Sequence, residues 1–160
     1  MTKSSTVAQP APIVVVGIDG SEDGRSALDW GAGEAHVRGA ILEVLHAWDA
    51  PAQAISVYGP APIPVFAPGY LERRATALAQ AASAEVHQLW PDLPIAISVA
   101  RGHAADALLY ASRRAALVVV GGRGLGGFTD LLLGSTSEYL VSHARCPVVV
   151  VRAPSDPSVD

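Results

Sequence analysis

Six glycines fall within the fourteen residues 121–134, and the run Gly-Ser-Thr-Ser begins at the last of them. Glycine has no Cβ and tolerates positive φ, so backbone N–H groups in such a stretch can converge on an anion. A helix that begins near Ser135 would add free N–H donors and the positive end of its dipole. These residues therefore predict a site for phosphate groups.

Two common phosphate motifs do not account for this stretch. A P-loop requires a lysine after its last glycine, and here Gly126 is followed by Gly127. A dinucleotide fingerprint does occur at Gly122, Gly124 and Gly127, after an apolar run. However, the segment that follows does not open a helix at once, and an acidic residue about twenty positions later is missing. Neither motif identifies the ligand.

The elements that must position these residues follow from the hydrophobic pattern. β-Branched apolar runs predict strands, and segments with three- and four-residue apolar spacing predict helices. Ser21 can cap the first helix, and Glu22 and Asp23 occupy its first turn. The alternation predicts an α/β fold with a doubly wound, mainly parallel five-stranded sheet and helices on both faces. The expected strands are 13–18, 40–48, 95–100, 116–120 and 147–152, and the expected helices are 21–38, 69–90, 103–115 and 135–144.

Such sheets bind ligands beyond the carboxyl ends of their strands, where the strand order reverses. Asp19 follows the first strand and Gly121 follows the fourth. If these two strands are neighbours at that point, both loops face one crevice.

Composition narrows the class of protein. The 160 residues are half apolar, which suits one globular domain at 13–152 with flexible tails at 1–12 and 153–160. A net charge of −4 with one lysine disfavours nucleic acid as a partner. No apolar stretch approaches a membrane span, and one cysteine suits the cytoplasm. Residues 49–67 contain four prolines and are expected to form a lid or mobile segment.

Taken in order, several segments resemble the ATP-binding branch of the universal stress protein family. The glycine pattern Gly121-x-x-Gly124, nine residues and then Gly134-Ser135 carries the resemblance. So do VVVGIDGSE, LEVLHAW, RGHAADAL and CPVVVV. The resemblance implies a sheet of order 3-2-1-4-5, ATP with Mg²⁺ as the ligand, and a regulatory role in the stress response. It also implies a homodimer through the last strand, 147–152, in which Val149→Pro is expected to favour monomers.

The resemblance also assigns roles at the site. Asp19 would accept hydrogen bonds from the ribose hydroxyls, which suits a carboxylate because it only accepts. The other positions would surround the base and ribose (Gly17, Ile18, Ala47), offer amides to the phosphates (Gly121, Gly124) and hold the phosphate chain at the last helix (Gly134, Ser135, Thr136, Ser137). Gly122 and Ala104 depart from the family, which often has serine and proline there.

Several alternatives stay open at this point. Ser135 and Glu138 have the spacing of a capping box, which needs no ligand. Phosphoryl transfer requires cations and usually metal-binding carboxylates, and near the glycines the chain offers only Arg123 and Asp130. We therefore assign no catalytic residue and no metal ligand. A nucleotide-binding module read by a regulatory partner is favoured over a slow ATPase or nucleotidyl transferase, and over a nucleotide-free dimerisation scaffold.

Overall fold

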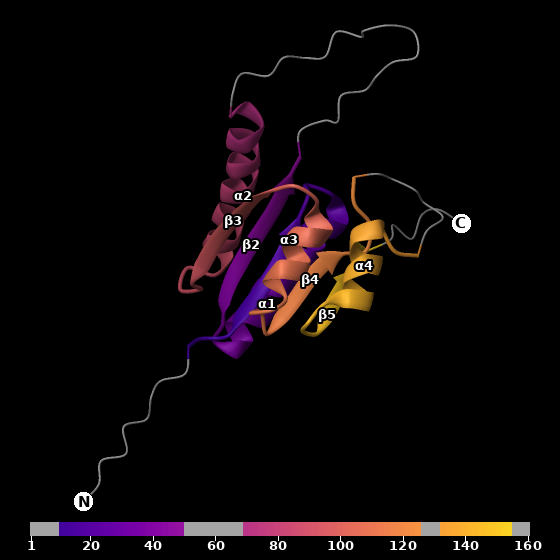
Figure 1. Cartoon of the computed structure of the whole chain (residues 1–160). Helices are drawn as coiled ribbons and strands as arrows, with labels where there is room; N and C mark the ends of the chain where they lie inside the picture. Colours follow the sequence, from indigo (N-terminus) through magenta and orange to yellow (C-terminus); the bar gives the residue numbers. More distant parts are fainter. Residues whose placement is uncertain (1–9, 50–68, 126–131, 155–160) are drawn as a thin grey trace, which may run out of the picture.

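The computed structural model describes residues 10–49, 69–125 and 132–154 (Figure 1). The chain alternates strands and helices in the order β1 (Ile13–Ile18), α1 (Glu22–Arg38), β2 (Ile41–Trp48), α2 (Tyr70–Leu89), β3 (Ile95–Arg101), α3 (Ala104–Ala111), β4 (Leu117–Gly121), α4 (Ser135–His143) and β5 (Val148–Val151). All strand pairs are parallel, and the order is β3-β2-β1-β4-β5. The predicted fold and strand order are therefore confirmed.

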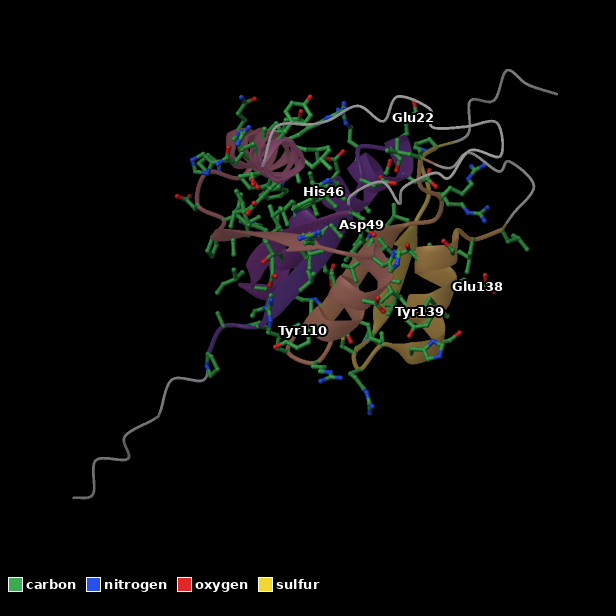
Figure 2. The ribbon with its side chains drawn as sticks, turned by 45° about the horizontal axis from the view of Figure 1, so that its top comes forward. Glu22, His46, Asp49, Tyr110, Glu138 and Tyr139 are labelled. Carbon is green, nitrogen blue, oxygen red and sulfur yellow. The ribbon has the colours of Figure 1, made fainter. Side chains whose placement is uncertain are left out.

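The sheet lies between two helical layers. Helices α1 and α2 cover one face, and α3 and α4 cover the other (Figure 1). The central strand β1 is buried on both sides, and Val14, Val15 and Val16 are each fully inaccessible. A continuous β-branched run is the pattern expected for such a strand, because both faces need apolar side chains. Figure 2 shows Tyr110 on α3 and Tyr139 on α4, the two helices of the second layer.

Helix α1 begins and ends where the sequence predicts. The Ser21 hydroxyl accepts the N–H of Gly24 at 3.0 Å, and Gly39 closes the helix with a φ of 60°. Midway along α1, a Cβ on Gly31 would collide with the Val16 side chain, whereas Gly33 has open space around it. Gly31 thus lets α1 lie directly on β1, which places the first turn of α1 beside the carboxyl end of that strand.

Helix α2 packs on the sheet through Ala75, Ala79, Ser83 and Val86, which are buried, while the apolar Leu89 at its end is 71% exposed. The chain turns back toward β3 directly after Leu89, and Leu93 in that turn is buried instead.

The described residues reach slightly beyond the predicted domain at both ends. The Pro12 carbonyl accepts the N–H of Ile41 at 2.9 Å, and the Ala153 amide donates to Asp23. The predicted segment 49–67 lies outside the described residues, apart from Asp49. No helix in the part of the chain that the structure describes is long and apolar enough to cross a membrane.

A buried carboxylate on β2 connects this strand to the edge strand β3 and to the turn after α3. Glu43 on β2 accepts two hydrogen bonds from the Arg114 guanidinium, at 2.6 and 2.7 Å, and one from the Ser98 hydroxyl on β3 at 2.6 Å. Burial raises the pKa of the Glu43 carboxyl, but these hydrogen bonds outweigh it and hold that pKa below its usual range. We call Glu43, Arg114 and Ser98 the Glu43 brace.

Candidate functional site

A cavity of about 470 Å³ opens where β1 and β4 lie side by side at their carboxyl ends. All ten residues that the sequence suggests for the site line it: Gly17, Ile18, Asp19, Ala47, Gly121, Gly124, Gly134, Ser135, Thr136 and Ser137. The strand order reverses at this point, because β2 and β4 flank β1 on opposite sides. The structure thus brings together four segments that are far apart in the sequence.

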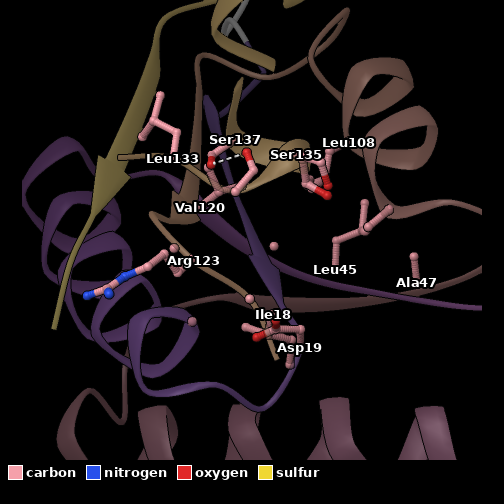
Figure 3. A pocket seen from close by; sticks show the side chains of 17 residues that line it. Ile18, Asp19, Leu45, Ala47, Leu108, Val120, Arg123, Leu133, Ser135 and Ser137 are labelled. Atoms are coloured by element: carbon pink, nitrogen blue, oxygen red, sulfur yellow. Dashed lines mark hydrogen bonds between the residues drawn. The ribbon is translucent and has the colours of Figure 1, made fainter. Parts of the chain in front are cut away.

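The cavity has an apolar side and a polar side. Figure 3 shows Leu45, Ala47 and Leu108 together at one side and Ser135 and Ser137 above, with Asp19 below. Leu45 could have been inferred from the sequence, since it lies two residues before Ala47 on one strand and so shares its face. Leu108 and Ala104 come from α3, and no sequence pattern predicts that α3 reaches this cavity.

Helix α4 begins differently from the capping box that the sequence suggests. Its N-cap is Gly134, which has no side chain to accept a hydrogen bond, and Ser135 is the first helical residue. Ser137 is 2% exposed, and its hydroxyl donates to the carbonyl oxygens of Gly134 at 2.9 Å and Gly122 at 3.2 Å. The capping-box interpretation is therefore wrong, because the helix starts one residue too early for Ser135 to serve as its cap. The first amides of α4 have no intrahelical acceptors and lie at the cavity.

Asp19 already connects two loops. Its Oδ1 accepts the Ser21 amide at 2.9 Å and the Ser21 hydroxyl at 2.6 Å, and its Oδ2 accepts the Leu125 amide at 3.1 Å. Each carboxylate oxygen has about two acceptor positions, so Oδ2 retains capacity for one more donor. Asp19 can thus accept a ligand hydroxyl while it holds the loop after β4.

Asp23 is a second carboxylate at this end, which the sequence indicated only as a first-turn residue. It is 7% exposed, and its Oδ2 accepts the Arg123 amide at 2.9 Å. Its Oδ1 accepts the Ala153 amide at 2.9 Å, from the segment after β5. A charge so deeply buried requires partners, and here backbone amides from two distant segments supply them.

The glycines of the described part of this loop allow other groups of the protein to approach the backbone closely. The positive φ that their residue type suggested is not observed at them. Positive φ occurs at Gly20, Gly39, Gly69 and Gly102 and at no other described glycine. A Cβ on Gly121 would lie 2.8 Å from the backbone nitrogen of Gly24, and one on Gly124 would lie 2.7 Å from Asp19 Oδ2. These glycines are therefore required because they lack a Cβ. The groups that approach them closely include the start of α1 as well as Asp19.

Among the described residues that line the cavity, Arg123 is the only one with a cationic side chain. Figure 3 shows its side chain directed away from Asp19 and the apolar side. Its Nε lies 3.8 Å from Asp23 Oδ2, and 41% of the side chain is exposed. Within 10–49, 69–125 and 132–154, no cluster of three His, Cys, Asp or Glu residues could hold a metal ion. Donors and acceptors at the site therefore come mainly from backbone amides, hydroxyls and Asp19.

Comparison with known proteins gives a family for this geometry. The model of the universal stress protein family matches residues 12–152. A universal stress protein of Mycolicibacterium smegmatis is 38% identical over 141 residues, which make up 87% of this chain and 45% of that protein. The chain spans about half the length of the curated relatives it matches.

Solved structures share the fold at lower identity. UspA from Lactobacillus plantarum superposes with a TM-score of 0.71 at 22% identity, covering 91% of this chain and 100% of that one. A universal stress protein in complex with cAMP gives 0.65 at 23% identity, covering 91% and 100%. A family member from Arabidopsis thaliana with AMP bound gives 0.60 at 20% identity, covering 92% and 95%.

Proposed function

This chain belongs to the universal stress protein family, and on that premise we propose that its cavity binds an adenine nucleotide, with ATP as the expected ligand. The observation that carries the proposal is the convergence of all ten suggested residues on one cavity of about 470 Å³. That volume is within the range of about 300–1,000 Å³ common for small-molecule sites. Solved relatives hold AMP and cAMP, which supports the adenine nucleotide class.

The two sides of the cavity suit the two ends of a nucleotide. An adenine ring is flat and largely apolar, and Leu45, Ala47 and Leu108 offer it an apolar wall. Asp19 lies at the end of β1, where its Oδ2 can accept a ribose hydroxyl. The phosphates then extend toward the first amides of α4, at Ser135 and Thr136.

Mg²⁺ belongs to this proposal through the phosphates. Mg²⁺ in nucleotide sites keeps several waters and takes most other ligands from phosphate oxygens, so it needs few protein carboxylates. Asp19 and Asp23 each accept backbone amides at both oxygens. We therefore expect them to orient the loops.

We infer a binding module in preference to an ATP-using enzyme. Amides and hydroxyls at the cavity stabilise bound phosphates in the ground state as well as in the transition state, and such uniform binding does not accelerate transfer. The Arg123 guanidinium forms an ion pair with Asp23. A slow ATPase or nucleotidyl transferase is the second candidate. A single-turnover rate on the order of 1 per second, lost in Arg123→Ala, would favour the enzyme.

Occupancy of the site would be read by a partner, and a second copy of the chain is the partner we propose first. β5 is an edge strand with four half-buried valines. The Pro147 carbonyl accepts the Val118 amide of β4, and the Val151 carbonyl accepts the amide of Gly122 directly after β4. The backbone groups of Val149 therefore also face β4, and the N–H of Val150 faces outward. Val149→Pro would thus damage the sheet itself, contrary to the sequence-based expectation, and Val150→Pro is the variant that tests antiparallel pairing.

The central test uses nucleotide affinity. The chain, purified without added nucleotide, is denatured and any released ligand is identified by mass spectrometry. Titration calorimetry then measures ATP, AMP, cAMP and GTP. At about 100 times the dissociation constant, a bound nucleotide should raise the free energy of unfolding by about 2.7 kcal/mol. Absence of binding by every adenine nucleotide at millimolar concentration would remove the proposal.

Matched variants separate the site from general stability. Asp19→Asn should weaken ATP binding by about 1–3 kcal/mol, since a charge-assisted hydrogen bond becomes a neutral one. Asp29 is an exposed aspartate on α1, so Asp29→Asn is the control and should bind ATP as the unsubstituted chain does. Equal affinity of the Asp19 variant and this control would exclude Asp19 from the site.

A further inference from the structure

The segment that leaves the sheet after β5 lies against the glycine loop. The Gly122 amide donates to the Val151 carbonyl at 2.7 Å. A Cβ on Gly122 would lie 2.9 Å from Arg152 Cγ, so the stem of Arg152 crosses directly over Gly122. The Arg152 guanidinium then donates to the carbonyl oxygen of Leu132. One exposed arginine thus connects the chain before residues 126–131 to the chain after them.

Asp23 completes this arrangement from the other side. One of its carboxylate oxygens accepts the Arg123 amide and the other accepts the Ala153 amide, each at 2.9 Å. The residue lies in the first turn of α1, whose backbone is packed against Gly121. Asp23 therefore ties the glycine loop and the segment after β5 to a rigid helix.

The loop held in this way also places the start of α4. The Gly122 carbonyl accepts the Gly134 amide at 2.7 Å and the Ser137 hydroxyl at 3.2 Å. A displacement of Gly122 would therefore move the first amides of α4. In contrast, Leu45, Ala47 and Leu108 come from β2 and α3 and do not depend on these contacts.

We propose that Asp23 and Arg152 are positioning residues for the phosphate end of the nucleotide site, which rests on the proposed function above. Neither is among the residues that line the cavity, so both act through the loop 121–125 and the start of α4. Positioned donors lose effect when they shift by a fraction of an ångström, because hydrogen bonds depend steeply on distance and angle. The base and ribose contacts keep their geometry. The consequence is selectivity: these residues favour nucleotides with phosphates over the bare nucleoside.

The test compares two ligands on the same variants by titration calorimetry. ATP has the phosphate chain, and adenosine has only the base and ribose. Arg152→Met keeps the apolar stem over Gly122 and removes the donor to Leu132. It should weaken ATP about tenfold, as expected for loss of one charge-assisted contact, and change adenosine less than about twofold. Arg152→Lys restores a donor and should recover most of the ATP affinity.

Two further variants complete the design. Asp23→Asn keeps the size of the side chain but leaves one acceptor oxygen for the two amides of Arg123 and Ala153. It should show the same ATP-selective loss. If that variant does not fold, the exposed Arg152 still carries the test. Arg38→Met removes an arginine of α1 that pairs with Glu34, and it should bind both ligands as the unsubstituted chain does.

The outcomes distinguish the two proposals. An equal loss of ATP and adenosine in Arg152→Met, or no loss of ATP, would overturn the positioning role and leave nucleotide binding intact. Failure of the unsubstituted chain to bind either ligand would overturn the proposed function and the positioning role with it. An ATP-selective loss with recovery in Arg152→Lys supports both.

Discussion

Asp23 and Glu43 are both buried carboxylates, 7% and 3% exposed, but their charges are compensated differently. Glu43 is held by side chains: a bidentate Arg114 and the Ser98 hydroxyl. Asp23 is held by the backbone amides of Arg123 and Ala153, with the Arg123 Nε more distant at 3.8 Å.

This difference indicates that Glu43 mainly stabilises the fold, whereas Asp23 mainly holds the geometry of the site. Arg114 is 47% exposed, so it can be solvated if Glu43 is lost. The amides that donate to Asp23 belong to the backbone, so they can form hydrogen bonds with water only if the chain around them moves. When Glu43 is lost, solvation of its side-chain partner Arg114 compensates part of the cost. When Asp23 is lost, its backbone partners can be satisfied only by a change in the loop, which deforms the site.

The largest expected effect is that of Asp23→Ala. The amides of Arg123 and Ala153 lose their acceptor, and each such group costs about 1–3 kcal/mol when it stays unsatisfied. We expect the free energy of unfolding to fall by about 2–4 kcal/mol on the same reasoning. Urea denaturation followed by circular dichroism measures it. A loss smaller than that of Glu43→Gln would reverse the comparison.

Glu43→Gln should cost less, about 1–2 kcal/mol, because the volume is kept and Arg114 can reach solvent. ATP affinity should stay unchanged, since the Glu43 brace does not line the cavity. A double-mutant cycle with Arg114→Met, read by urea denaturation, isolates the energy of the pair. Weakened ATP binding in the folded Glu43 variant would show that the brace also supports the site.

The pH dependence of the Glu43 brace follows from the lowered pKa of Glu43. A carboxyl whose folded pKa lies below its unfolded pKa, about 4.3 for glutamate, stabilises the fold fully above the unfolded value. This contribution is lost as pH falls through the folded pKa. The stability difference between the unsubstituted chain and Glu43→Gln should thus be constant near pH 7 and shrink below about pH 4. Urea titrations at a series of pH values would contradict this if the difference grew in acid.

Ser98→Ala is the smallest change. It removes one of three hydrogen bonds to Glu43 and leaves both bonds from Arg114. The expected loss is about 0.5–1.5 kcal/mol, the usual net value of one hydrogen bond. Ser142→Ala, which removes an exposed hydroxyl bonded to the Glu138 carbonyl, is the control and should change stability less in the same denaturation assay.

The order of strands and helices, and a phosphate site at the glycine-rich stretch, can be predicted from the residue pattern. Buried parallel strands need continuous apolar runs, and helices between them need periodic ones, so the order of elements can be read directly. Asp19, Gly121 and Gly134 follow strands or precede a helix, and the topology of such sheets brings these ends together. Local pattern and chain direction suffice for the order of the elements, whereas the strand order and the full set of ten site positions followed from the resemblance to the family.

The hydrogen-bond partners within the site depend on contacts between segments far apart in the chain. Nothing near Asp23 in the sequence indicates that it accepts amides 100 and 130 residues away. The same is true of Arg152 over Gly122, and of α3 as a wall of the cavity. Such contacts depend on how close α1, β4 and the end of β5 approach one another, to within an ångström. Packing of the whole sheet sets that distance, and no local spacing encodes it.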